Sequence, residues 1–304
     1  MPLARYFGVV CVFALTALPA RAQVQLEWKL KEGDSFFLQT DSKFVQVLEL
    51  VGKEAGKEIK QEIEQTTLLQ FKVEKKDEKT GVLTVRETIE GLRVKGVPDE
   101  KIQGATFTFT LSPPPKMVVD NFQGYADFIK KVSGDDPAIA KTMKAILSED
   151  LLKVSAKEAF SFLPDKPVKE GDTWGADRTI KVPIGPLGSM DVVNTYKYEG
   201  KDKVGGKEFD KITFTTAVTY AAPKEDSGLT FKVTKGELKT EGAKGKIFFD
   251  REAGRLVQYE TELKTTGQFT LSINNVPLET KITKQEQAIK ATVSAENPIT
   301  SKPK

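Results

Sequence analysis

Alternation of apolar and polar residues with a period of two dominates this chain and constrains its fold most. Phe107, Phe109 and Leu111 alternate with threonines, and Ile212 and Phe214 lie on one face of a later run. Successive side chains of a β-strand point to opposite faces, so each run predicts a strand with one buried and one wet face. Such strands are typical of antiparallel sheets that meet solvent on one side.

The middle of the chain replaces this pattern with helical spacing. Asp136 followed by Pro137 predicts a helix start, because an N-cap acid and a proline at the first helical position are both favoured there. Ser148 is a second N-cap candidate, and Pro164 and Pro167 end the segment. We therefore predict a mainly β (α+β) fold. Two antiparallel β-meanders form a curved sheet or half-barrel, with a short helical segment between them.

The same patterns divide the chain into five parts. We predict a signal peptide at 1–22, a first β-meander at 23–122, a helical segment at 123–163, a second β-meander at 164–293 and a disordered tail at 294–304.

Residues 1–22 have the features of a secretory signal peptide. Arg5 supplies a positive charge, residues 7–18 form an apolar run, and Ala20 and Ala22 frame an A-x-A cleavage pattern. The apolar run is shorter than the roughly 20 residues that span a bilayer, so we favour cleavage after Ala22 over an uncleaved anchor helix. The mature chain is then expected to be secreted or periplasmic, with no integral membrane span.

The residue types that are missing argue against several kinds of chemistry. The chain has no His, and its single Cys, Cys11, lies in the predicted signal peptide, so the mature chain is cysteine-free. Ser-His-Asp or Cys-His catalysis and His or Cys metal sites are therefore not expected. Nucleotide-binding glycine motifs and a D-x-D-x-D-G calcium loop are also missing, although an oxygen-only calcium site stays open. We predict no catalytic residue, no metal site and no cofactor.

The charge balance argues against a nucleic-acid partner. The chain has 46 Lys+Arg and 43 Asp+Glu, and residues 1–22 contain two of the Arg and no acid, which leaves 44 against 43. So small a net charge exerts no bulk attraction on nucleic acid or anionic lipid. Paired carboxylates could still hydrolyse a glycosidic bond, but most acids here alternate with Lys on wet strand faces. A carboxylate-based hydrolase is therefore a remote alternative.

Aromatic residues on the apolar strand faces form the candidate binding surface. They either fill an ordinary core or line a hydrophobic cavity, because a curved sheet closed by amphipathic helices is a suitable shape for an apolar ligand. The candidates are Trp28, Phe107, Phe109, Trp174, Phe214 and Phe248.

A short repeat links the two β-rich parts. The tetrapeptide Lys-Glu-Gly-Asp at 31–34 recurs at 169–172, with a Trp close to each copy. Each copy opens a strand-rich stretch that contains a strand-turn-strand pair, 107–119 in the first and 247–259 in the second. Two related meanders would explain this pattern, and a chance tetrapeptide is the alternative.

Three segments resemble a family of uncharacterised secreted proteins of planctomycete-type bacteria. They are LEWKLKEGD at 26–34, FLPDKPVKEGDTW at 162–174 and GKIFFD followed by GRLV at 245–257. The resemblance covers nearly the whole mature chain and implies no activity and no site residue. The expected architecture is more loosely similar to the periplasmic lipoprotein-carrier half-barrel, and this likeness implies an acyl chain bound in a hydrophobic groove.

Two functional hypotheses follow. The first is an exported non-enzymatic envelope protein that binds a hydrophobic or lipidated ligand in its curved sheet, and it predicts a sizeable apolar pocket. The second is a structural or protein-interaction module of the envelope without a small-molecule ligand. It predicts a solid core together with an exposed apolar patch or an open sheet edge.

Overall fold

The computed structural model describes residues 23–51, 56–95, 97–98, 100–113, 117–223, 231–273 and 276–298. The predicted signal peptide and the last residues of the predicted disordered tail lie outside this part of the chain.

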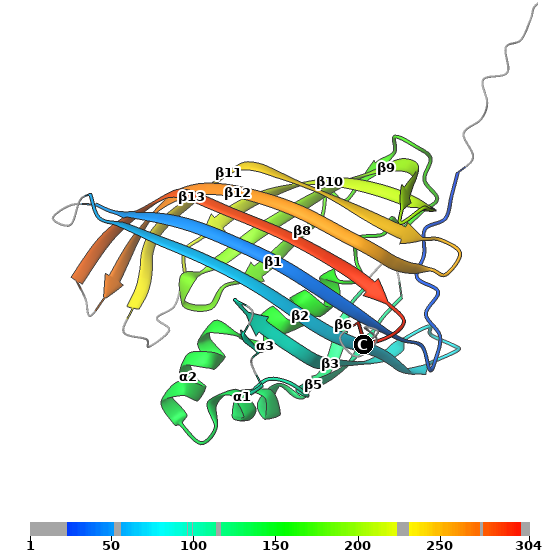
Figure 1. The fold of residues 1–304 in the computed structure, drawn as a ribbon, viewed down its shortest axis with the longest axis horizontal. Helices are drawn as coiled ribbons and strands as arrows, with labels where there is room; N and C mark the ends of the chain where they lie inside the picture. The colour runs from blue at the N-terminus through cyan, green and yellow to red at the C-terminus, as the bar shows by residue number, and fades with distance from the viewer. Residues whose placement is uncertain are drawn as a thin grey trace, which may run out of the picture.

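A single antiparallel sheet of 13 strands makes up most of the molecule (Figure 1), which confirms the predicted fold class. Its order is β6-β5-β3-β2-β1-β13-β12-β11-β10-β9-β7, and β4 and β8 pair with β3 and β9. The strands are β1 (Ser35–Leu50), β2 (Glu58–Lys76), β3 (Leu83–Val94), β4 (Val97–Pro98), β5 (Thr106–Leu111), β6 (Val119–Gln123), β7 (Thr173–Trp174), β8 (Thr179–Pro183), β9 (Ser189–Val204), β10 (Lys207–Ala221), β11 (Phe231–Asp250), β12 (Arg255–Ile273) and β13 (Val276–Ser294).

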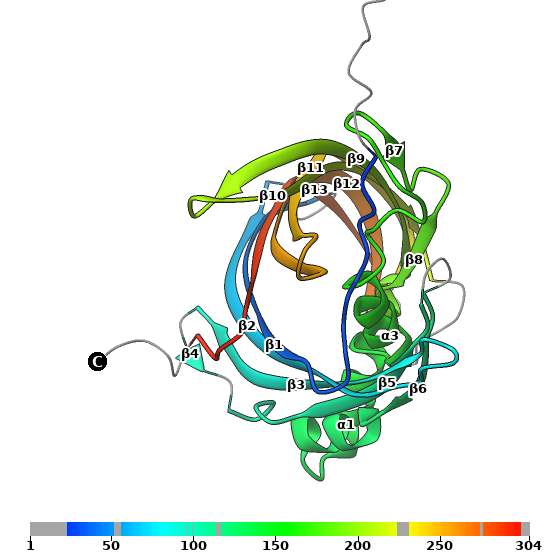
Figure 2. The same cartoon turned by 90° about the vertical axis from the view of Figure 1, so that its right-hand side faces the viewer.

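Pairing between the first and the last long strand joins the two halves. β1 runs antiparallel to β13 from Phe37 opposite Ser294 to Leu50 opposite Thr280. The two meanders, β1–β6 and β7–β13, are therefore one continuous sheet. Viewed along the strands, the sheet curves round so that its two ends approach each other, with α3 between β6 and β8 (Figure 2).

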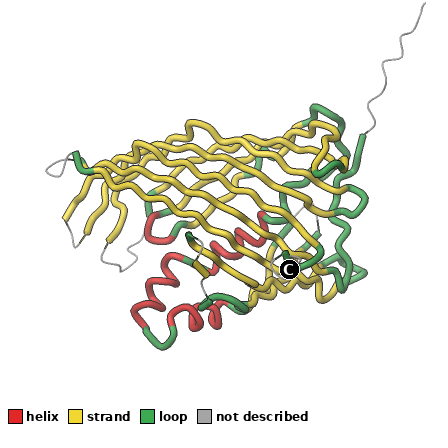
Figure 3. Tube along the Cα trace, in the orientation of Figure 1, coloured by secondary structure: helices red, strands yellow, loops and turns green. Residues whose placement is uncertain are grey.

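The helices lie between the two meanders in the sequence and gather on one side of the sheet (Figure 3). They are α1 (Tyr125–Ser133), α2 (Pro137–Ile146) and α3 (Glu149–Glu158), followed later by the 3-10 turn η2 (Gly185–Leu187). The predicted caps are present, because Asp136 accepts the N–H groups of Ala138 and Ile139, and Ser148 accepts that of Leu151. In the described part of the chain, no helix is long and apolar enough to cross a membrane.

Alternate strand residues pack against these helices and form the core. Phe71 contacts Phe160 beyond the end of α3, in a cluster that also contains Phe36 and Phe109, and Phe107 contacts Phe128 of α1. A third cluster joins β9, β10 and β11 to the segment 162–168. We call this side of the sheet the helix-facing side and the opposite side the polar face. The two sides carry the two halves of the alternating pattern that the sequence shows.

The repeated tetrapeptide forms the same turn twice. In the first copy, the N–H of Gly33 donates to the carbonyl of Val73 (2.9 Å), whose own N–H donates to the carbonyl of Asp34 (2.8 Å). In the second, Gly171 and Asp172 make the same two bonds with Tyr198 (2.8 and 3.0 Å). Both glycines have positive φ, 89° and 96°, a conformation that glycine adopts without strain. Val73 and Tyr198 are thus equivalent positions of the two halves.

Candidate functional site

Four of the six predicted lining residues are packed in the core. Phe107 and Phe109 are buried on β5. The Trp28 ring lies edge-on to three phenyl rings at centroid distances of 5.3 to 5.5 Å, and its Nε1 donates to the carbonyl of Phe160. The Trp174 ring stacks on Tyr196, and its Nε1 donates to the carbonyl of Phe162. The two Trp residues therefore tie the N-terminal segment and β7 to the chain that follows α3.

The other two predicted residues are buried as well, and Phe214 belongs to the core cluster against which Trp174 packs. Phe214 is buried, stacks on Tyr259 and borders the polar-face groove described below. Phe248 is buried beneath the Lys246 ammonium, which lies 5.9 Å from its ring centroid. The six residues do not surround one cavity. Trp28 lines a cavity of about 20 Å³ between the sheet and the α3 end, which has room for about one water.

A groove of about 1270 Å³ lies on the polar face of the sheet. Its position follows from strand alternation, because Lys246 borders the groove whereas its neighbour Ile247 is in the core, and Lys197 borders it next to the core residue Tyr196. Lining residues come from nine strands, β1, β2, β3, β7 and β9 to β13. The groove therefore crosses both halves of the sheet.

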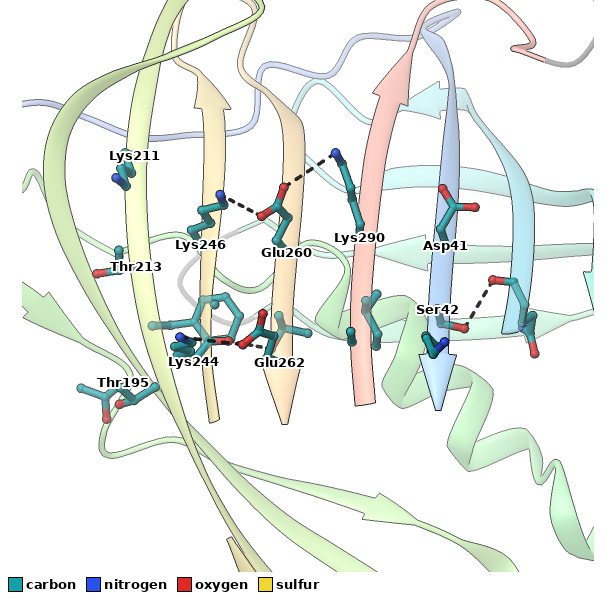
Figure 4. Close-up of a pocket in the computed structure, with 18 of the residues that line it drawn as sticks. Asp41, Ser42, Thr195, Lys211, Thr213, Lys244, Lys246, Glu260, Glu262 and Lys290 are labelled. Atoms are coloured by element: carbon teal, nitrogen blue, oxygen red, sulfur yellow. Dashed lines mark hydrogen bonds and ion pairs between the residues drawn. The ribbon is translucent and has the colours of Figure 1, made fainter. Parts of the chain in front are cut away.

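Two rows of side chains, all polar except Ala288, cross the groove in register (Figure 4). Each member of a row is the partner of the next on the neighbouring strand, so the rows run across the strands. The first row, from β3 to β7, is Arg93, Thr66, Asp41, Lys290, Glu260, Lys246, Thr213, Lys197 and Thr173. The second row, from β2 to β9, is Glu64, Lys43, Ala288, Glu262, Lys244, Thr215 and Thr195.

Cross-strand ion pairs connect the charges in these rows. Glu260 lies 2.8 Å from the Lys246 ammonium and 3.8 Å from that of Lys290, and Glu262 lies 3.7 Å from Lys244 (Figure 4). These pairs are largely exposed, and exposed pairs contribute only ~0–1 kcal/mol each to stability. Cations still outnumber acids among the lining residues, with Lys43, Arg93, Lys197, Lys211, Lys244, Lys246 and Lys290 against Asp41, Glu64, Glu260 and Glu262.

Two acids at the edge of the groove are held in their charged form. The hydrogen bond from Lys197 lowers the pKa of Glu199, and the hydrogen bond from Lys211 lowers the pKa of Asp202. By contrast, burial raises the pKa of Glu87 to about 7 and raises that of Glu158. Those two acids lie on β3 and α3, on the helix-facing side. The carboxyl groups that burial makes easier to protonate are thus outside the groove.

The described residues include no group of three or more His, Cys, Asp or Glu side chains placed to hold a metal ion. The groove offers a broad surface of ammonium, carboxylate and hydroxyl groups. Such a surface can hold a polar ligand by many weak contacts.

Sequence reasoning missed the groove. It assigned the alternating Lys and Glu residues to wet strand faces, and they do lie on one. The signal that could have found them is the alternation of Lys or Thr at 195 and 197 in β9, at 211, 213 and 215 in β10, and at 244 and 246 in β11. That signal acquires its meaning only from the pairing of the strands.

Solved structures that match this chain include several of low similarity. DynF from the dynemicin biosynthesis pathway of Micromonospora chersina is 10% identical over 95% of this chain and 92% of that one, with a TM-score of 0.17. A mutant porin of Rh. blastica is 8% identical over 85% of this chain and 100% of that one, with a TM-score of 0.22. A structure described under asymmetric conductivity of engineered proteins has the same identity and coverage and a TM-score of 0.23. These scores support no argument about function.

No curated protein matches the chain. A family model does match residues 100–276, which is more than half of the 304 residues. The chain therefore belongs to a family of unknown function, DUF6263.

Proposed function

We propose that this chain is an exported, non-enzymatic binding protein of the cell envelope, and that the polar-face groove is its binding surface. The observation that carries this proposal is the groove itself, about 1270 Å³ in volume and bordered by nine strands. Small-molecule sites occupy some 300–1,000 Å³, so the groove is large enough for an extended ligand.

Export is part of the proposal and is supported by the sequence. The n-region, apolar run and A-x-A pattern of residues 1–22 match a secretory signal, and a cysteine-free mature chain needs no disulfide chemistry outside the cytoplasm. The non-enzymatic assignment is supported by the missing His and by the pairing of Glu260 and Glu262 with lysines.

A hydrophobic or lipidated ligand on the helix-facing side, as in the lipoprotein carriers that the architecture resembles, has less support. The cavity next to Trp28 and Phe160 holds about 20 Å³, far less than an acyl chain occupies. The strand faces that could have lined a larger space are instead filled by α1, α3 and the segment 162–168.

A protein-interaction role is the second candidate, and one surface favours it. Helix α2 has no fully buried residue, and its Ile139 and Ile146 are 46% and 44% exposed. The neighbouring η2 turn adds Leu187, which is 43% exposed. Exposed apolar residues that gather in this way often mark a contact with another protein.

The cysteine-free mature chain allows a direct test of the groove. A single cysteine introduced by Thr213→Cys would place an environment-sensitive fluorophore in the groove, and Lys144→Cys on α2 would place the same label outside it. We expect fractionated envelope polymers and lipids to produce a saturable signal change from the Thr213 label alone.

The opposite result would redirect the assignment. A response of the Lys144 label alone would favour the protein-interaction role of the α2 surface. No response at Thr213, combined with a lipid-sized mass that stays bound to residues 23–304 in native mass spectrometry, would favour the helix-facing side.

A further inference from the structure

Strands β10 and β11 separate along part of their length. They pair with each other only between residues 210–215 and 244–249. Beyond this, residues 216–221 pair only with β9, and residues 231–243 pair only with β12. We call the gap between these two stretches the seam. On each side of it, alternate backbone N–H and C=O groups point away from the one paired neighbour and have no partner strand in the described part of the chain.

A tyrosine spans the seam on the helix-facing side. The Tyr220 hydroxyl donates to the carbonyl of Leu187 (2.6 Å), and its ring lies edge-on to Phe269 at a centroid distance of 5.0 Å. A Cβ on Gly236 would lie 2.4 Å from the same ring. Side chains of paired strands stand upright over strands only about 4.8 Å apart, so a β10 ring that reaches the β11 backbone requires the two strands to diverge. The seam is therefore fixed by packing.

The other open edges of the sheet are covered or already used. Near its two ends, β6 and β8 both contact α3. Residues 58–64 of β2 lack a partner strand on one side, but the carbonyl of Glu64 accepts the N–H of Lys95. Glu62 and Glu64 also hold Lys43 in salt bridges of 2.5 and 3.0 Å. The β11 side of the seam is thus the longest unpaired strand edge in the described part of the chain.

Charged side chains on the β11 side of the seam lack charged partners. Lys235, Glu237 and Lys239 lie on the polar face and form no salt bridge within the described residues. Their neighbours on β12 are neutral, namely Thr270, Gln268 and Thr266. Across the seam, the polar-face residues of β10 are also neutral, namely Ala217, Thr219 and Ala221. A strand in the seam with acidic, basic and acidic side chains at alternate positions would therefore pair all three charges.

A second copy of this chain carries the matching charges but would collide at the seam. Its Glu58, Lys60 and Glu62 alternate on the open edge of β2. However, β2 pairs with β3 from Gln65 onward, and the seam closes at Thr215. The β3 strand of a second copy would therefore meet β10 within a few residues of any such pairing. A single extended segment brings no neighbouring strand with it.

We propose that the seam binds an extended segment of a partner polypeptide, which adds as a strand to the edge of β11. The main chain of the segment bonds to the unpaired N–H and C=O groups of residues 235–240, the regular stretch between the two bulges of β11. On the polar face, its alternating acidic, basic and acidic side chains pair with Lys235, Glu237 and Lys239. This inference goes beyond the groove and does not depend on it.

The test is calorimetric titration of residues 23–304 with the capped peptide TEVKVET, together with two copies N-methylated at its charged residues or at its valines. We expect saturable binding of the unmodified peptide. At least one methylated copy should bind roughly tenfold more weakly, because it lacks the N–H groups that face β11. Lys235→Glu with Glu237→Lys should shift the preference to the charge-reversed peptide TKVEVKT. The matched control, Glu58→Lys with Lys60→Glu, makes the same exchange on the edge of β2 and should leave the preference unchanged.

Hydrogen exchange of the same mixtures locates the site, and the inference requires new protection within residues 235–240. No binding of TEVKVET, or equal binding of both methylated copies and the parent peptide, would refute strand addition. A preference altered only by the β2 variant would move the site to that edge. A concentration-dependent dimer that the β11 variant abolishes would replace the partner by a second copy. The Thr213 label reports on the groove separately, so failure at the seam and failure of the proposed function are distinguishable.

Discussion

The N-terminal and C-terminal halves of the sheet use the same turn but fill the space beside it differently. Counting back two residues from Val73 and from Tyr198 gives Phe71 in the first half and Tyr196 in the second, both in the core. Each half also has a bulge directly after the turn contact, at Glu74 or Glu199. Equivalent positions can therefore be compared across the two halves.

The comparison isolates one unusual side chain. Phe71 is paired across the sheet with Glu87, which is paired with Phe107, whereas in the second half Tyr196 is paired with Phe214, which is paired with Gly245. A Cβ on Gly245 would lie 2.1 Å from the Phe214 ring, so the glycine makes room for the phenylalanine. In the first half, Phe107 occupies the position that corresponds to Gly245. Glu87 occupies the position that corresponds to Phe214. Similar backbones thus hold an aromatic ring in one half and a carboxyl group in the other, depending on the size of the residue on the neighbouring strand.

The largest expected effect concerns the buried polar contact that distinguishes the second half. Asp210 is 2% exposed, accepts the Tyr198 hydroxyl at 2.5 Å and lies 3.6 Å from Arg251. Tyr198→Phe should lower the free energy of unfolding by about 2–3 kcal/mol, because a hydrogen bond to a buried charge is lost. Urea unfolding measures this.

The matched control for that change is Tyr196→Phe. Its hydroxyl only accepts a 3.3 Å bond from Asn194, so the loss should stay below about 1 kcal/mol. Equal losses at the two tyrosines would show that the Asp210 contact does not stabilise the second half.

Glu87 should have the next largest effect, and the effect depends on pH. Its folded pKa of about 7 lies above the ordinary value of 4.5 because burial disfavours the charge. The folded state then holds a proton that the unfolded state has lost between pH 4.5 and 7, so stability falls as pH rises through that window and is constant above it. Glu87→Gln should add about 2 kcal/mol to the free energy of unfolding at pH 8 and almost nothing at pH 4.

The control for Glu87 is Glu100→Gln, which removes the same charge at an exposed position. It should leave the pH dependence of unfolding unchanged. A Glu87→Gln protein with the wild-type pH profile would contradict the assignment of that dependence to burial.

The two turns should respond alike to a smaller change. Gly33 and Gly171 both have positive φ and no heavy atom within 4 Å of an added Cβ, so alanine meets strain but no clash. Gly33→Ala and Gly171→Ala should each cost about 1 kcal/mol in thermal or urea unfolding. If the two costs differ by more than about 1 kcal/mol, the turns share a backbone shape but contribute differently to stability.

The smallest effect is expected in the groove. Lys244→Gln with Lys246→Gln removes two exposed ion pairs, so unfolding should change by less than about 0.5 kcal/mol. A larger loss would indicate that these lysines support the sheet, and it would weaken the assignment of the groove to binding.

Local signals predicted much of the fold. The alternation around Phe107 and Ile212 predicted strands, and Asp136, Pro137 and Ser148 predicted the starts of two helices, because those signals act over a few residues. The β1–β13 pairing could not be predicted from the sequence, because nothing local to either strand specifies a partner more than 200 residues away.

The groove could not be predicted from the sequence for the same reason. Asp41 and Lys290 become neighbours only through that pairing, and the line from Arg93 to Thr173 needs eight strand pairings in register. The predicted binding surface consisted of aromatic residues because apolar side chains give the strongest sequence signal. In the structure most of them pack in the core. The groove is lined mainly by Lys, Thr, Glu and Asp, residue types that are common on any protein surface.

The β1–β13 pairing also constrains the order in which the sheet can fold. A chain that emerges N-terminus first exposes β1 long before residues 276–294 appear, so one side of β1 lacks its partner for most of synthesis. An open strand edge of that length invites pairing with other chains. Contacts of such large sequence separation also slow folding. The centre of the sheet is thus its last part to close, and a truncation at the C-terminus would remove the middle of the sheet and leave its edges in place.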